Sequence, residues 1–120
     1  KTEKNHLMSQ LTTHILDTSK GKPAAGVKII LEKSGPANSW THLSEGITDA
    51  DGRVSNLLKK EVILDPGHYK LKFDTASYFS NQNIKCFYPS VEIIFEITDA
   101  SHYHVPLLLN PFGYSTYRGS

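Results

Sequence analysis

The sequence predicts an all-β fold, a β-sandwich formed by a single domain over residues 10–120. Three observations indicate it. Short runs rich in branched and aromatic residues recur along the chain, turn-forming residues separate them, and only one segment has a helical pattern. Seven or eight short strands with one short helix is the content expected of a sandwich of two sheets. A chain of 120 residues with 38% hydrophobic content can bury one core but is too short for two domains.

In the first half of the chain, four segments have the pattern of strands. Each ends where Gly, Pro, Ser or Asp residues favour a turn. The Asp51-Gly52 step suits a tight turn in particular, because glycine tolerates a positive φ. The expected strands are Leu11–Thr18, Val27–Lys33, Trp40–Thr48 and the short Arg53–Ser55.

The second half of the chain contains the one expected helix. Asp74 or Thr75 can cap a helix over Asp74–Asn83, on which Tyr78 and Phe79 form an apolar side. Strands are expected on either side of this helix. They are His68–Phe73, in which polar and apolar residues alternate, and then Val91–Thr98, His102–Leu109 and Tyr114–Tyr117.

Composition argues against several kinds of partner. The chain has 13 Lys+Arg against 12 Asp+Glu, a net charge of +1 and no cationic stripe, so we expect no nucleic-acid partner. No apolar run approaches the roughly 18–20 residues needed to cross a bilayer, so no membrane partner is expected. Cys86 is the only cysteine, which excludes an intrachain disulfide, and we expect it to be a small core residue rather than a nucleophile. Residues 1–9 are expected to be a disordered tail or a tag remnant outside the fold.

Three of the six histidines lie in predicted strands and are candidates for chemistry. His14 belongs to the first strand, and His102 and His104 are two residues apart, so their side chains share one face of a later strand. Imidazole titrates near neutral pH, which suits a histidine that faces a cavity to proton transfer. Each histidine taken alone is more typical of a partly exposed surface position than of a catalytic site. The others are expected to be surface residues: His6, His42 and His68.

The same histidines offer an alternative, because a His-x-His pair with a third histidine can form a zinc site. However, the sequence has no His-Glu-x-x-His segment and no carboxylate at a fixed spacing to orient such ligands. It also lacks a Gly-x-Ser-x-Gly elbow, a phosphate-binding glycine loop and a Cys-x-x-Cys pair. From the residues alone, the prediction stops at a β-sandwich with a candidate histidine site.

Three separated motifs carry a resemblance to a known family. They are Leu11–Asp17 followed by Gly21–Ala24, then Asp51–Arg53, and then His102–Leu109 followed by Pro111–Ser120, which ends in Tyr-Arg-Gly-Ser. Together they resemble the 5-hydroxyisourate hydrolases, also called transthyretin-related proteins. The resemblance extends from about residue 10 to the last residue. One departure is Asn110, which stands where many members have serine.

The resemblance implies a transthyretin-like fold, two four-stranded sheets with a short helix between the fifth and sixth strands. It implies a homotetramer with sites in a channel between two dimers. Because the zinc-type motif is missing, we expect an activity without a metal, and no cofactor is expected. The implied substrate is the small molecule 5-hydroxyisourate, whose ring is opened to 2-oxo-4-hydroxy-4-carboxy-5-ureidoimidazoline in urate catabolism. A cytoplasmic location is expected, with a periplasmic location as the alternative if a signal peptide has been removed.

The resemblance also implies which residues form the site. The implied catalytic residues are His14, Arg53 and His104. Substrate binding is implied for His14 and Arg53 together with Tyr117 and Ser120. The alternative function is that of a ligand carrier of the transthyretin type, which lacks the two histidines, the arginine and the Tyr-Arg-Gly-Ser ending. A hydrolase predicts that these side chains converge on one cleft, whereas a carrier predicts an apolar channel.

The expected mechanism is the attack of water on a ring carbonyl. One of His14 and His104 is expected to take the proton of the water while the other delivers a proton to the ring. Arg53 is expected to hold substrate oxygens with its planar donor fork, and Tyr117 to orient the substrate. His102 is not among the catalytic positions that the resemblance implies.

Overall fold

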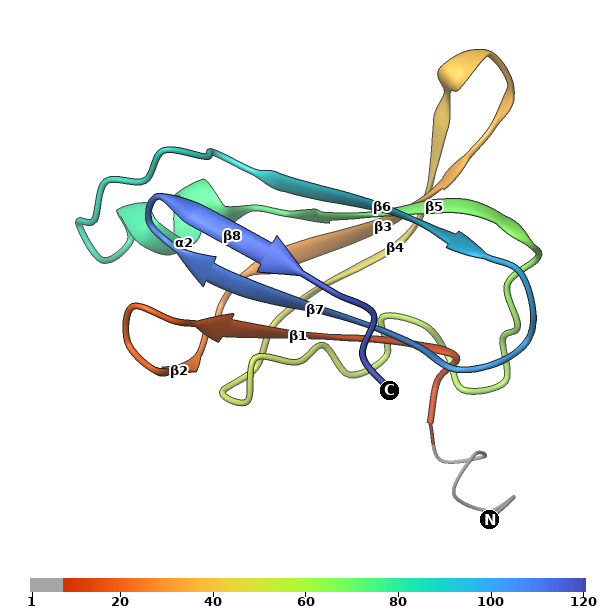
Figure 1. Ribbon diagram of the computed structural model, residues 1–120, viewed down its shortest axis with the longest axis horizontal. Coiled ribbons are helices and arrows are strands. Elements are labelled where there is room, and N and C mark those ends of the chain that lie inside the picture. The colour runs from red at the N-terminus through yellow and green to blue at the C-terminus, as the bar shows by residue number, and fades with distance from the viewer. Residues whose placement is uncertain (1–7) are drawn as a thin grey trace.

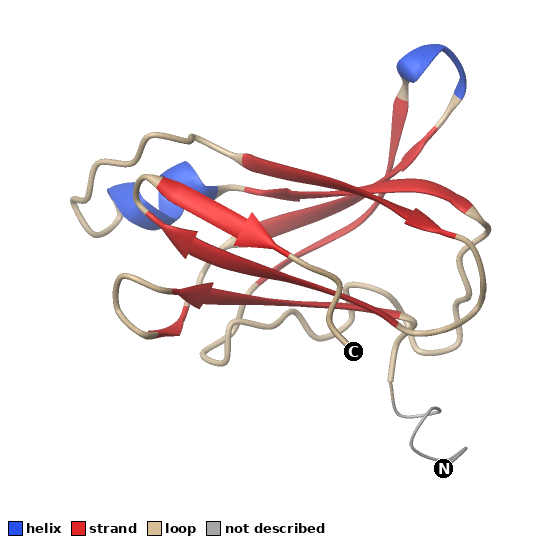
Figure 2. Cartoon of the chain, in the orientation of Figure 1, coloured by secondary structure: helices blue, strands red, loops and turns tan. Residues whose placement is uncertain are grey.

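The computed structural model describes residues 8–120 and consists of two facing four-stranded sheets (Figure 1). The strand order is β2-β1-β7-β8 in the first sheet and β4-β3-β5-β6 in the second. Helix α2 (Thr75–Ser80) lies at one end of the sandwich, and a 3-10 turn, η1 (Pro36–Asn38), joins β3 to β4 (Figure 2). The strands are β1 (Leu11–Asp17), β2 (Lys22–Pro23), β3 (Lys28–Ser34), β4 (Trp40–Ile47), β5 (Gly67–Phe73), β6 (Val91–Ile97), β7 (Tyr103–Asn110) and β8 (Gly113–Thr116).

The predicted architecture is confirmed, including the helix between the fifth and sixth strands. Asp74 caps α2 as expected, because its carboxylate accepts hydrogen bonds from the Ser77 backbone amide at 3.2 Å and hydroxyl at 2.8 Å. The helix ends at Ser80 rather than at the predicted residue 83. Asn83 has a φ of 58°, which a continuing α-helix does not allow.

The prediction of a strand over Arg53–Ser55 was wrong. Only Arg53 pairs, in an isolated antiparallel bridge with His14, and Asn56 follows with a φ of 68° that ends the extended backbone. Conversely, Lys22–Pro23, for which no strand was expected, forms the short edge strand β2 against β1. Pairs this short give no periodic signal in a sequence.

The core lies between the two sheets and follows the alternation of their strands. In β1, Leu11, Thr13 and Ile15 are buried, whereas Thr12 and His14 on the opposite face are half-exposed. The fully buried side chains include Tyr69, Phe73, Phe79, Ile29, Leu31, Leu71, Ile97 and Leu107. Cys86 is half-buried and packs against this core, as expected for a small apolar residue.

One carboxylate lies inside this apolar core. Asp17 is fully buried, and its oxygens accept hydrogen bonds from the Tyr78 hydroxyl at 2.6 Å and from the Ser19 backbone amide at 3.0 Å. Among residues 8–120, every buried side-chain nitrogen or oxygen has a hydrogen-bond partner. Asp17 therefore links β1 to α2 without an unsatisfied buried charge.

The two ends of the chain meet in the first sheet. β1 pairs in parallel with β7, and this register places Thr12 opposite His104 and His14 opposite Pro106. All other strand pairs are antiparallel. The parallel pair brings side chains about ninety positions apart in the sequence onto the same outer face of the sheet.

Part of the predicted tail belongs to the domain. The half-buried Ser9 donates a hydrogen bond from its hydroxyl to the Leu58 carbonyl, which attaches it to the loop between β4 and β5. The rest of the predicted tail, residues 1–7 with His6, lies outside the described residues. No helix within residues 8–120 is long and apolar enough to cross a membrane.

Candidate functional site

The candidate site lies on the outer face of the β2-β1-β7-β8 sheet. Thr12 and His14 of β1 alternate with the buried residues and point away from the core, as do His102 just before β7 and His104 within it. The imidazole rings of His102 and His104 are nearly parallel, with centroids 6.4 Å apart and an angle of 15° between their planes. The shared face predicted for these two histidines is therefore confirmed.

A cleft of about 430 Å³ lies on this face, between the sheet and the loop from Arg53 to Lys60. Of its fourteen lining residues, nine are polar or charged. A second hollow of about 660 Å³ lies beside it and shares Met8, Ser9, Lys60 and His102. The cleft is lined by Met8, Ser9, Leu11, Thr12, Arg53, Val54, Ser55, Asn56, Leu57, Leu58, Lys60, His102, His104 and Ser120.

A tight turn brings Arg53 to the cleft. The Asp49 carboxylate accepts hydrogen bonds from the backbone amides of Asp51 at 2.9 Å and Arg53 at 3.1 Å. Gly52 has a φ of 75°, and a Cβ atom there would lie 2.5 Å from the Ile15 carbonyl oxygen and 3.2 Å from Cδ2 of His14. Only glycine fits this position, so the Asp-Gly-Arg motif sets the arginine backbone directly against His14.

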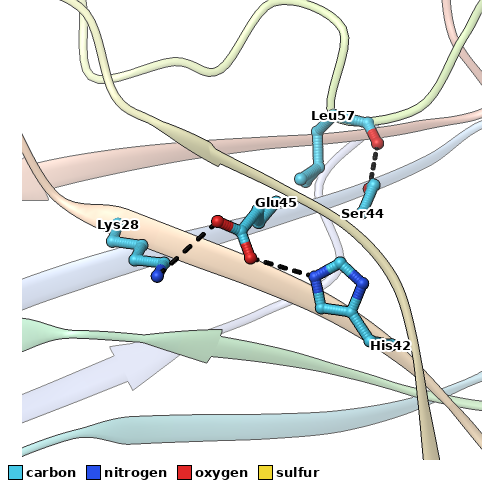
Figure 3. A network of polar contacts seen from close by, with 5 residues as sticks. All are labelled: Lys28, His42, Ser44, Glu45 and Leu57. Carbon is cyan, nitrogen blue, oxygen red and sulfur yellow. Dashed lines mark hydrogen bonds and ion pairs between the residues drawn. The ribbon is translucent and has the colours of Figure 1, made fainter.

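The opposite wall of the cleft is held by a contact to the second sheet. The Ser44 hydroxyl on β4 donates a hydrogen bond to the Leu57 carbonyl, as Figure 3 shows. Beside it, the Glu45 carboxylate lies between Lys28 at 3.6 Å and His42 at 3.0 Å. The hydrogen bond from His42, followed by the charge of Lys28, lowers the pKa of this exposed carboxyl. His42 is thus a surface residue that hydrogen-bonds Glu45, as its lack of sequence context suggested.

Positive charge accumulates around the histidines. Burial lowers the pKa of His104, and the nearby charges of Arg53, His102 and His14 lower it further. Burial also lowers the pKa of His102, with a contribution from Arg118. Both rings are therefore biased toward their neutral forms, in which an imidazole can accept a proton near neutral pH.

Thr12 connects the two rings. Its hydroxyl oxygen lies 2.8 Å from Nδ1 of His104 and 3.0 Å from Nε2 of His102. Both distances are within hydrogen-bonding range. With Nδ1 of His104 engaged by Thr12, Nε2 is the nitrogen of that ring that is left for the cleft.

The C-terminal segment crosses the same face. The Gly119 amide donates a hydrogen bond of 2.8 Å to the His104 carbonyl, which places Ser120 on the cleft wall. Arg118 donates to the His102 carbonyl at 3.2 Å and stacks over the Tyr103 ring at 4.2 Å. These contacts fix the path of the Tyr-Arg-Gly-Ser ending.

The structure brings together three of the five predicted site residues. Arg53, His104 and Ser120 line the cleft. His14 does not line it, but its backbone pairs with Arg53 and its charge acts on His104. Tyr117 is outside the lining as well, with 58% of its surface exposed.

Sequence reasoning missed Thr12, Lys60 and His102 as residues of the cleft. For His102 a signal existed, because it shares a strand face with His104. For Thr12 the only available signal was its position two residues before His14 on the same face of β1. Lys60 lies in a loop without periodicity and gave no signal.

The three histidines do not form a metal site in this arrangement. Within residues 8–120 there is no group of three or more His, Cys, Asp or Glu side chains placed to hold a metal ion. Metal independence of any activity stays a prediction.

Comparisons with known proteins find the same family that the three sequence motifs resemble. The model of the HIUase/Transthyretin family matches residues 11–119. The 5-hydroxyisourate hydrolase of Salmonella dublin is 46% identical over 111 residues, which cover 92% of this chain and 80% of that protein.

Two solved structures show the same fold. The 5-hydroxyisourate hydrolase of Klebsiella pneumoniae superimposes with a TM-score of 0.80 and 37% identity, covering 92% of this chain and 98% of that one. Sea bream transthyretin in complex with thyroxine gives a TM-score of 0.85 with 34% identity, covering 92% and 94%. By its sequence and its fold, the chain therefore belongs to the HIUase/Transthyretin family.

Proposed function

We propose that this protein is a hydrolase that opens the ring of 5-hydroxyisourate to 2-oxo-4-hydroxy-4-carboxy-5-ureidoimidazoline in urate degradation. The relatives named 5-hydroxyisourate hydrolase support this activity. The observation that carries the proposal is the cleft itself, where Arg53 and His104 meet beside the backbone of His14. A guanidinium and imidazoles on one polar wall suit a planar substrate rich in carbonyl and amide groups.

In the proposed mechanism, water attacks a ring carbonyl with the help of the histidines. One of His14 and His104 removes the proton of the water, and the other, or the pair jointly, protonates the departing ring nitrogen. Arg53 holds the substrate oxygens and stabilises the negative charge that develops on the attacked carbonyl. The lowered pKa of His104 supports a neutral, proton-accepting ring at working pH.

Tyr117 and Ser120 have binding roles in this proposal. Ser120 lies on the cleft wall, where it can contact the substrate. Tyr117 stands nearby on the segment that leads from β8 to Gly119, and its exposed ring is available for stacking and hydrogen bonding.

We also propose that the protein is a homotetramer. The exposed aromatic residues around β8 support an assembly, since Phe112 is 71% exposed and Phe87 is 68% exposed. Phe87, Tyr88 and Tyr114 form a chain of edge-to-face contacts on the surface, with ring centroids 4.8 Å and 5.4 Å apart. Burial of this patch between subunits would add buried apolar area, which a small domain has little of on its own.

A carrier function is the second candidate, because the TM-score of 0.85 with sea bream transthyretin in complex with thyroxine is as high as the 0.80 with the Klebsiella pneumoniae hydrolase. The shared fold therefore does not separate the two functions. The ionisable groups in the cleft favour the hydrolase, because an apolar ligand would have to bind against the polar side chains of Arg53, Lys60 and His104.

The test is to add freshly generated 5-hydroxyisourate and follow the decay of its absorbance. The protein should accelerate this decay well above the spontaneous rate, and Arg53→Lys should remove most of the acceleration, since an ammonium group cannot reproduce the two-pronged contact of a guanidinium. An unchanged decay rate, together with tight binding of thyroxine, would replace the hydrolase proposal with the carrier.

A further inference from the structure

The Thr12 side chain contacts both histidines of the cleft. Its hydroxyl oxygen is within hydrogen-bonding distance of Nδ1 of His104 and Nε2 of His102, at 2.8 Å and 3.0 Å. Its position is fixed by the parallel pairing that places it directly opposite His104. Its hydroxyl therefore links the two rings.

A threonine hydroxyl has one hydrogen to donate and two lone pairs that accept. At most one of the two rings can therefore accept a hydrogen from Thr12. If His102 accepts on Nε2, the Thr12 oxygen is left to accept the hydrogen on Nδ1 of His104. In that arrangement Nε2 of His104 carries a lone pair, as a general base requires.

We infer that Thr12 is a positioning residue whose hydroxyl selects the tautomer of His104 and makes it depend on the protonation of His102. This inference rests on the proposed function, and it assigns the role of general base to His104. When His102 gains a proton it can no longer accept from Thr12. The hydroxyl hydrogen then turns to Nδ1 of His104, and the hydrogen of the neutral His104 ring moves to Nε2, which can no longer take a proton from water.

The charged surroundings favour the active arrangement near neutral pH. His104 faces Arg53 from the loop after β4 and His14 from β1, and His102 faces Arg118 from the C-terminal segment. Lys60 lies on the wall of the same cleft. All of these groups are cations or become cations on protonation, so they oppose a charge on His102. In the neutral ring with its hydrogen on Nδ1, Nε2 of His102 accepts from Thr12.

The tautomers can be measured directly in the wild-type protein. Nitrogen-15 NMR of histidine-labelled protein distinguishes a protonated Nδ1 from a protonated Nε2, and His104→Ala assigns the signals. At pH 8 His104 should carry its hydrogen on Nδ1, and its signals should change to the Nε2–H form in step with the protonation of His102. A His104 that carries its hydrogen on Nε2 at pH 8 would overturn the inference.

Substitutions test the catalytic consequence. Thr12→Val keeps the shape but removes the hydroxyl, and it should lower kcat by about tenfold or more while KM changes less than about twofold. Thr12→Ser should restore kcat to within about threefold of the wild type. Thr13→Val is the matched control, because its hydroxyl lies one position along the same strand and donates into the core, to the Val105 carbonyl at 2.7 Å. The control should retain the wild-type kcat.

A Thr12→Val variant with wild-type kcat, or one in which only KM rises, would overturn the inference. The second result would show that Thr12 contacts the substrate rather than the histidines. If the wild type itself failed to turn over 5-hydroxyisourate, the proposed function would fall, whereas the NMR titration would still decide whether Thr12 couples the two rings. The two failures are thus distinguishable.

Discussion

Replacement of Gly119 by alanine tests the cleft without removing any functional group. The added Cβ atom would lie 2.6 Å from Cδ2 of the His104 ring and 3.2 Å from its Cγ. Carbon atoms in favourable contact are about 3.5–4.0 Å apart, so the methyl group is about 1 Å too close. The ring or the C-terminal segment must therefore move.

Either movement breaks a contact that defines the site. The ring is held on its other side by Thr12 at 2.8 Å, and the segment by the hydrogen bond of 2.8 Å between the Gly119 amide and the His104 carbonyl. Misplacement of a reacting group by about 1 Å costs about 10²-fold in rate. Loss of one hydrogen bond at the edge of a sheet costs only about 1 kcal/mol of stability. Gly119→Ala should therefore lower kcat/KM by about 10²-fold and leave the protein folded.

The assay combines the rate of 5-hydroxyisourate decay with thermal unfolding of the same samples. Gly113→Ala is the matched control in the same C-terminal segment, because its added Cβ atom would come no closer than 3.7 Å to the Asn110 side chain. That variant should keep both its activity and its stability. Wild-type kcat/KM in Gly119→Ala would show that the position of His104 does not matter for the reaction.

Four further predictions follow from the site and the core. His14→Ala and His104→Ala should each lower kcat by about 10²-fold or more at pH 8, with the double variant little worse than either. His102→Ala removes only the acceptor of the Thr12 hydrogen, so it should lower kcat by about tenfold, as Thr12→Val does; a loss equal to that of His104→Ala would refute this assignment. Dialysis against a chelator should leave turnover intact, and a loss that zinc restores would revive a site of three histidines. Light scattering should report about four times the chain mass of 13.4 kDa, and a fully active monomer would contradict the proposed tetramer. Tyr78→Phe should lower the free energy of unfolding by about 1.5–3 kcal/mol at pH 7, because the buried Asp17 carboxylate loses a hydrogen-bond donor. Burial and the bond to Asp17 raise the pKa of Tyr78 from 10.0 to about 12, so this contribution is fully present below pH 10 and lost as the pH rises through 12. Denaturant unfolding at pH 7 and above pH 10 measures it, and an equal loss of stability in wild type and variant between these pH values would contradict it.

Elements with strong local patterns could be predicted from the sequence. The alternation of His68–Phe73 and the cap at Asp74 are local properties of a few residues, and both appear in the structure at the expected places. The length of α2 was overestimated because the run Asn81-Gln82-Asn83 indicates a helix end without fixing which of its residues ends it. The isolated bridge between Arg53 and His14 was mistaken for a strand, because a single paired residue produces no periodic pattern in the sequence.

The candidate site was predictable only where residue type was informative. Arg53 and His104, which line the cleft, were predicted because family motifs contain them, and Ser120 because it ends such a motif. Thr12 could not be found in this way, since threonine is an ordinary residue on the exposed face of a strand. Its importance appears only when the parallel register sets it between two rings that follow it by about ninety residues.

The parallel pairing of β1 with β7 also governs how the molecule is made. β1 is synthesised before β7, which emerges about ninety residues later, so the edge of β1 that pairs with β7 stays unpaired for most of the synthesis. Closing so long a loop is slow, and domains dominated by distant contacts typically fold in milliseconds to seconds. Because the same pairing brings His104 beside Thr12, a stalled or shortened chain that lacks β7 cannot form even part of the contact between them in the cleft. Catalytic competence is acquired in the step that closes the first sheet.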